Sequence, residues 1–63
     1  MSVATFQAQH QLNKATEAKD NAALHNISCK AKSLAKVAYN NKNQEEGNRW
    51  WRIHKDAERA HLS

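Results

Sequence analysis

The chain contains no proline and a single glycine, Gly47, among its 63 residues. Proline interrupts helices, and glycine is the usual residue where the backbone turns with a positive φ. Because both are scarce, long helices are favoured and other residues have to make the turns. Long apolar runs are absent as well, since no stretch approaches the roughly 18 consecutive apolar residues of a membrane span. We therefore expect no membrane-spanning segment and no membrane partner.

Cysteine is also scarce, and this bears on the compartment. Cys29 is the only cysteine, so no disulfide can form within the chain, which fits a reducing environment. Residues 1–11 lack the basic and apolar regions of a secretory signal. The expected location is the cytoplasm.

Large apolar residues are few for a folded domain. Leu, Ile, Val and Phe together number nine, whereas alanine occurs eleven times. Alanine favours helix and lets helices approach closely, but it supplies little volume to a core. A chain of this length forms one domain at most, residues 1–63, and we expect a homodimer or a larger partner protein to complete the core.

Acidic residues are missing between Asp20 and Glu45, and this segment also carries the clearest helical pattern. Its apolar positions are three and four residues apart, which places them on one stripe of an α-helix; they are Leu24, Ile27, Ala31, Leu34 and Ala38. A weaker stripe precedes it at Ala4, Ala8, Leu12 and Ala15, and another follows at Trp50, Ile53, Ala57 and Ala60.

These patterns predict an all-α protein, either a small antiparallel helical hairpin or a three-helix arrangement. The expected helices cover about residues 3–18, 22–40 and 44–61. Asp20 and Asn21 are suitable N-cap residues and favour a break, but a single helix from Val3 to Tyr39 is an alternative. Asn43 and Glu46 have the spacing of a capping box, so the main turn is expected between Asn41 and Asn48.

The second and third stripes can pack against each other in an antiparallel hairpin. With the turn near Gln44, Trp50 would lie near Ala38, Ile53 near Leu34 and Ala35, and Ala57 near Ala31. Ala60 or His61 would lie near Ile27. Large residues then face small ones, as a densely packed interface requires.

The whole excess of positive charge lies between Ala22 and Lys42, because the segments on either side are neutral. The cations there could contact phosphates or an acidic protein surface; they are Lys30, Lys32, Lys36 and Lys42. A plain solvated helix face is the other interpretation, since lysine commonly fills exposed helical positions.

Arg49-Trp50-Trp51-Arg52 is the second feature that suggests a binding site. Two adjacent tryptophans point about 100° apart on a helix, so Trp50 can enter the core while Trp51 points to a flank. Trp51 is then either a cover over the first helix, packing on Phe6 or Leu12, or a functional residue: an anchor for a partner, or a base-stacking platform beside Arg52 and Lys55. The candidate partner-binding residues are Phe6, Arg49, Trp51, Arg52, Lys55 and Leu62.

Catalytic and metal sites have little support. His54, Glu58 and His61 share one helix face, but there is no second cysteine and no HExxH pattern, so we expect no metal and no other cofactor. No set of acid, base and nucleophile points to an enzyme.

Two functions follow from these features. The first is a non-enzymatic protein-binding regulator, such as an adaptor or inhibitor, that presents helix faces and a Trp/Arg anchor to a larger protein. The alternative is a nucleic-acid-binding protein that uses the Lys30 to Lys42 segment on phosphates.

Overall fold

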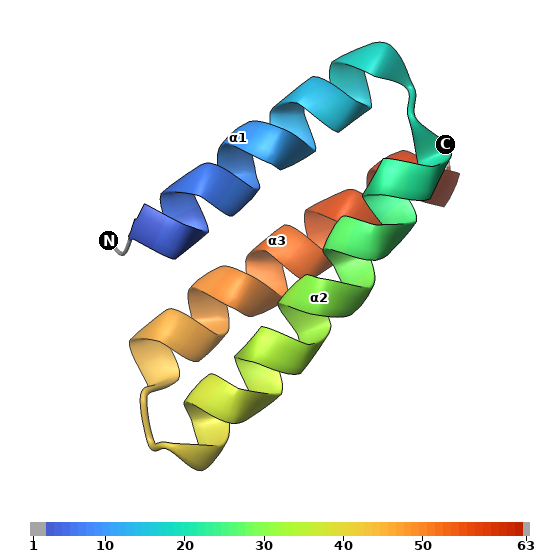
Figure 1. The fold of residues 1–63 in the computed structure, drawn as a ribbon. Coiled ribbons are helices and arrows are strands. Elements are labelled where there is room, and N and C mark those ends of the chain that lie inside the picture. The colour runs from blue at the N-terminus through green and yellow to red at the C-terminus, as the bar shows by residue number, and fades with distance from the viewer. Residues whose placement is uncertain (1–2, 63) are drawn as a thin grey trace.

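A computed structural model of the chain describes residues 3–62, with the exception of the side chain of Leu62. The described residues form three helices and no strand, α1 (Val3–Ala18), α2 (Asn21–Asn40) and α3 (Gln44–Leu62), so the protein is all-α as predicted. Each helix runs in the opposite direction to the one before it (Figure 1). None of the described helices is long and apolar enough to cross a membrane.

The first two helices are separate, and the alternative of one helix from Val3 to Tyr39 is not formed. Lys19 has a φ of 55°, its N–H donates to the Thr16 carbonyl, and the N–H of Asp20 donates to the Ala15 carbonyl. This pair of bonds is a Schellman motif, which normally has glycine at the left-handed position. Asp20 then begins α2, because its carboxylate accepts a hydrogen bond from the Ala23 N–H at 3.2 Å.

The second turn repeats the same chemistry at residues 41–43. Lys42 has a φ of 61°, and its backbone N–H donates to the Tyr39 carbonyl, while the backbone N–H of Asn43 donates to the Ala38 carbonyl. The Asn43 side chain accepts from the Glu46 N–H at 3.2 Å and so caps α3. The chain's single glycine takes no part in either turn, since Gly47 lies inside α3. Lysines therefore occupy both positions where a glycine would be expected.

The core lies mainly between α2 and α3, which share most of the contacts between helices. The fully buried residues are largely the predicted ones: Leu12, Ala15, Leu24, Ala31, Ala35, Ala38, Trp50, Ile53 and Ala57. The pattern prediction for α2 was right at Leu24, Ala31 and Ala38 and wrong by one position at Ile27 and Leu34. Ser28 and Ala35 are buried against α3, whereas Ile27 and Leu34 are only partly buried. Small residues hold the interface because they let the two helices approach closely.

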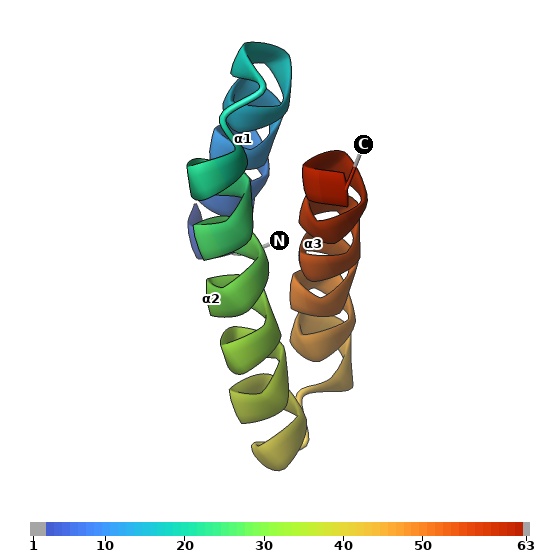
Figure 2. The ribbon, with the colours of Figure 1, turned by 90° about the vertical axis from the view of Figure 1, so that its right-hand side faces the viewer.

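The first helix packs on this hairpin less extensively, although it lies along its length (Figures 1 and 2). It buries Thr5, Leu12 and Ala15 completely and Ala8 in part, while Ala4, predicted for the same stripe, is exposed. The molecule measures 34 × 20 × 13 Å along its principal axes. Because α1 covers only part of the hairpin, residues of α2 and α3 that face it remain accessible in grooves.

Gly47 contacts the ring of Tyr39 across the second turn. A β-carbon at position 47 would lie 2.6 Å from two ring carbons of Tyr39. The ring is held there by the Tyr39 hydroxyl, which donates to the Asn48 side chain at 2.7 Å. The backbone of Gly47 is helical, so this position does not need glycine for a positive φ. It needs glycine because a larger residue would clash with the Tyr39 ring.

Replacing Lys19 or Lys42 with glycine should raise the free energy of unfolding by about 0.5–1 kcal/mol each, because a β-carbon is unfavourable at positive φ. Urea unfolding followed by circular dichroism measures the change. Lys14→Gly, inside α1, is the matched control and should lower the free energy of unfolding by about 1 kcal/mol. Destabilisation by all three substitutions would contradict the two left-handed turns.

The contact between Gly47 and Tyr39 predicts a change of sign. Gly47→Ala in the native chain should lower the free energy of unfolding by up to about 2 kcal/mol, because the Tyr39 ring has to move. In a Tyr39→Ala background the same substitution should raise it by about 1 kcal/mol, the ordinary helix preference of alanine. Equal effects in the two backgrounds, measured by thermal unfolding, would show that the ring does not restrict position 47.

Candidate functional site

Four of the candidate partner-binding residues lie on two different sides of α3. Arg49 and Arg52 line a groove between α1 and α3, together with Thr5, Gln9, Ile53 and Asp56. Trp51 points away from that groove, since its ring lies 5.0 Å from the ring of His54, and His54 faces α2. Lys55 places its ammonium group 5.4 Å from the centre of the Trp51 ring. The structure therefore brings Trp51 together with Lys55 and separates it from Arg52.

Phe6, a further candidate, lies on α1 and apart from both groups. Phe6 is 63% exposed on α1, and Trp51 is 37% exposed, so neither belongs to the core. The ring contacts of Trp51 are with residues of its own helix, and Leu12 is buried separately. Trp51 is thus not a cover that buries Phe6. The side chain of Leu62 lies outside the described residues.

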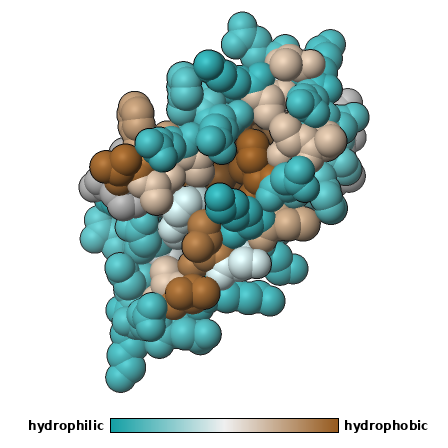
Figure 3. All heavy atoms as spheres, viewed as in Figure 1, coloured by the Kyte–Doolittle hydropathy of each residue, from teal (hydrophilic) through white to brown (hydrophobic). Residues whose placement is uncertain are grey.

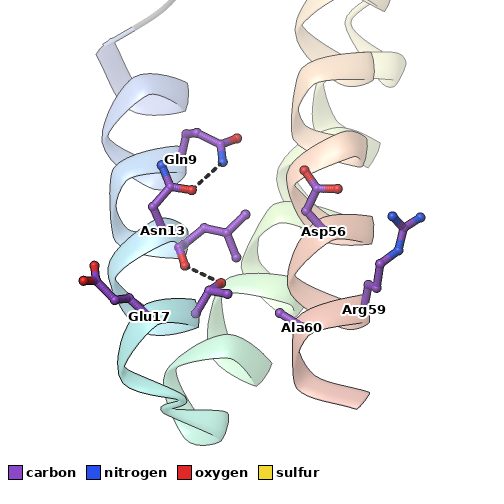
Figure 4. A pocket seen from close by; sticks show the side chains of 8 residues that line it. Gln9, Asn13, Glu17, Asp56, Arg59 and Ala60 are labelled. Carbon is purple, nitrogen blue, oxygen red and sulfur yellow. Dashed lines mark hydrogen bonds between the residues drawn. The ribbon is translucent and has the colours of Figure 1, made fainter. Parts of the chain in front are cut away.

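Most of the residues that line the groove between α1 and α3 are polar or charged, although their apolar atoms supply most of its surface. Its wider part, about 470 Å³, is lined by Gln9, Leu12, Asn13, Thr16, Glu17, Asp56, Arg59 and Ala60 (Figure 4). The Gln9 and Asn13 side chains bond to each other at 3.2 Å along α1, and the Thr16 hydroxyl donates to the Leu12 carbonyl. These bonds stay within α1, so they stiffen one wall of the groove without joining the two walls.

The groove between α1 and α2 is apolar at its base. Its volume is about 160 Å³, and its lining combines core and partly buried residues: Ala4, Gln7, Ala8, Gln11, Ile27, Lys30, Ala31, Leu34 and Trp50. Figure 3 shows apolar residues running from between α1 and α2 down along α2, with hydrophilic residues on either side. Val37, which is 54% exposed, is further along the same helix. Ile27 and Leu34 are the largest aliphatic side chains in this groove.

On the side of the hairpin that faces away from α1, side-chain contacts join α2 to α3. Tyr39 bonds to Asn48 near the turn, and Ser28 bonds to His54 further along. At the far end the rings of His25 and His61 lie 5.8 Å apart. We call this side, which faces away from α1, the outer flank. Trp51 and Lys55 belong to it.

The four lysines of the segment from Lys30 to Lys42 do not share one face. Lys30 lines the groove toward α1. Lys32 and Lys36 follow Ser28 at intervals of four residues and therefore lie along the outer flank. Lys42 is in the turn. Lys32 and Lys36 are therefore the two of the four that lie together on the outer flank.

Ser28, His54 and Glu58 form the most connected group of polar side chains described. The Nδ1 atom of His54 lies 2.8 Å from the Ser28 hydroxyl and 2.9 Å from the Ser28 carbonyl oxygen. The carbonyl can only accept, so Nδ1 carries hydrogen and donates to it. The Nε2 atom lies 3.3 Å from a carboxylate oxygen of Glu58, an ion pair when the ring is charged.

Serine, histidine and glutamate also form the nucleophile, base and orienting acid of many hydrolases, so the surroundings of Ser28 can be compared with those of a catalytic serine. A nucleophile needs space beside its hydroxyl for a substrate carbon and for donors to the developing oxyanion. Ser28 and His54 are both buried in the interface between α2 and α3, with 8% and 7% of their surfaces exposed. We therefore interpret the group as a link between the two helices.

The His54, Glu58 and His61 side chains, considered from the sequence as metal ligands, do not come together as one set. His54 is directed to Ser28, and His61 lies beside His25. The exposed Cys29 has its sulfur 3.6 Å from Nε2 of His25. Among the described residues no group of three or more histidine, cysteine or acidic side chains is placed to hold a metal ion.

The sequence patterns missed Thr5, Ser28 and His54 as buried residues. Each is polar, so an apolar pattern passes over it. The signal that could have found Ser28 and Thr5 is the spacing alone, because both continue a series of three- and four-residue steps on their helices. His54 lies between Trp50 and Ala57 on the same basis.

Comparisons with known proteins give no family for this chain. No protein-family model matches it, and no curated protein or solved structure matches it significantly. Its function is therefore argued from its own surfaces.

The link between Ser28 and His54 makes a stability prediction. His54→Ala should lower the free energy of unfolding by about 2–3 kcal/mol, because it removes a buried ring and the partner of the Ser28 hydroxyl. Glu58→Gln is the matched control at the solvent-exposed end of the link and should cost less than about 1 kcal/mol. Urea unfolding provides the measurement, and a loss below about 1 kcal/mol for His54→Ala would contradict the link.

Proposed function

We propose that this protein is a small non-enzymatic regulator, an adaptor or inhibitor, that binds an amphipathic helix of a larger protein in the groove between α1 and α2. The observation that carries the proposal is the incomplete burial of Ile27 and Leu34 at the base of this groove. A helix laid between α1 and α2 would cover both residues, as helix-in-groove recognition does elsewhere.

The number of helices supports the same proposal. Three helices leave one side of the α1–α2 pair without a neighbour, and a fourth helix would complete a bundle around the same core. The groove is continuous with that core, because Trp50 and Ala31 belong to both. Core volume missing from the chain is then supplied by the partner, as the low content of large apolar residues suggests.

Charge indicates the chemistry of the partner helix. Lys30 lies at the groove, and α2 contains no acidic residue to balance its lysines. The other polar groups at the groove are the uncharged amides of Gln7 and Gln11. A helix with an apolar stripe and acidic flanks fits this surface better than a basic one.

A second copy of the chain is the other occupant to test, and it would make the protein a homodimer. The proposal also includes a cytoplasmic location, supported by the exposed and unpaired Cys29.

The binding experiment uses Trp50 as the reporter, in a Trp51→Phe background that leaves one indole. The probe is a synthetic amphipathic helix with leucines on one stripe and glutamates on the other face, compared with its lysine counterpart. We expect the acidic peptide to bind and to shift Trp50 emission. Leu34→Ala should weaken binding by about tenfold, the loss expected for one well-buried aliphatic contact.

Matched charge reversals locate the site independently of packing. Lys30→Glu should lower the affinity for the acidic peptide by up to about fivefold, the range of an exposed ion pair. Lys32→Glu, on the outer flank, should leave that affinity unchanged. Equal effects of the two reversals, or no response of Trp50 to either peptide, would contradict the groove. Sedimentation at micromolar concentration detects a homodimer, and its loss in Leu34→Asp would assign the groove to self-association.

A further inference from the structure

We propose that the outer flank of the α2–α3 hairpin binds single-stranded nucleic acid, with Lys32, Lys36 and Lys55 on phosphates and Trp51 stacked on a base. This site is separate from the groove between α1 and α2, and it does not depend on a ligand there.

Two hydrogen bonds between the helices place these residues together. Tyr39 bonds to Asn48, and Ser28 bonds to His54. On α3, Trp51 lies midway between Asn48 and His54. On α2, the residues between Ser28 and Tyr39 that share their side of the helix are Lys32 and Lys36. The two lysines therefore lie across the interface from Trp51.

The charge of this flank is positive. Lys32, Lys36 and Lys55 are exposed, and none of them has an ion-pair partner among the described residues. Glu58 is the acidic residue on this flank, and its carboxylate is directed to His54. The other ion pair recorded, between Arg49 and Glu45, lies on the side of α3 that faces α1. Three unpaired cations on one face provide the attraction that phosphates require.

The indole of Trp51 is suited to stacking. It is 37% exposed, and the ring of His54 supports it at 5.0 Å from beneath the surface. Because His54 is itself fixed by Ser28, the indole is held in place before a ligand arrives. The ammonium group of Lys55 lies over the ring at the end of a long flexible side chain. When a base stacks on Trp51, this ammonium group can leave the ring and contact a phosphate instead.

Single strands fit this surface better than a duplex. A half-buried indole on the flank of a hairpin cannot reach bases stacked inside a duplex, whereas unpaired bases can turn outward onto it. Tyr39, 39% exposed, provides a second aromatic ring toward the turn. Alternating aromatic rings and cations are typical of single-strand binding surfaces.

The experiment measures fluorescence anisotropy of a labelled single strand of about 12 nucleotides, long enough for such a site, at about 50 mM salt. Lys32→Glu with Lys36→Glu should abolish binding. Lys14→Glu with Lys30→Glu makes the same charge change away from the outer flank and should retain most of it. Trp51→Ala should lower the affinity by about fivefold or more, the effect of losing one stacked base. Circular dichroism checks that each variant keeps its helices.

The salt dependence and two competitors complete the test. Three phosphate contacts predict a slope of log affinity against log salt of about −2, at about −0.7 per contact on a single strand. Heparin, a polyanion without bases, should bind equally well to the native chain and to Trp51→Ala. No binding of the single strand, equal losses in the two charge-reversed variants, unchanged affinity in Trp51→Ala, or tighter binding of an acidic peptide to this flank would each overturn the proposal.

Discussion

The close approach of α2 and α3 along small side chains is the constraint on which the rest of the structure depends. Ala35 and Ala57 are fully buried where the helices meet, and the larger Trp50 and Ile53 fill the space between them. Small residues occupy this line from Ser28 to Ala38, so Ile27 and Leu34 are displaced to its side, whereas Leu24 near the start of α2 is fully buried. Ile27 and Leu34 consequently face α1, and the α1–α2 groove exists for this reason.

The polar link beside this line has a similar effect on α3. Ser28 can be buried at the interface because its hydroxyl and its carbonyl both form hydrogen bonds with the imidazole of His54. Burying these groups costs little when each has a partner. The same link fixes the rotation of α3, and with it the direction of its neighbours. Trp51 falls outside the core on one flank, while Arg52 falls on the other.

Much of the helical framework could be predicted from local chemistry. Helix ends depend on nearby residues such as Asp20 and Asn43, whose side chains cap the following helices as their positions suggest. The rotation of α2 could not be predicted from hydropathy, which ranks Ile27 above Ser28. Size and hydrogen bonding at the interface decided the order instead. The groove between α1 and α2 could not be predicted either, because no local pattern determines how closely α1 packs on the hairpin. The separation of Trp51 from Arg52, in contrast, follows from helix geometry once the buried stripe of α3 is known.

The limited packing of α1 has a consequence for how the molecule opens. A helix held mainly by Leu12, Ala15 and Thr5 can detach while the α2–α3 pair remains folded, since most helix contacts lie within that pair. Backbone amides of α1 would then exchange with solvent through a partial unfolding event of lower free energy than global denaturation. One wall of the α1–α2 groove is therefore movable, and the width available to an incoming helix varies with the fraction of time that α1 is released.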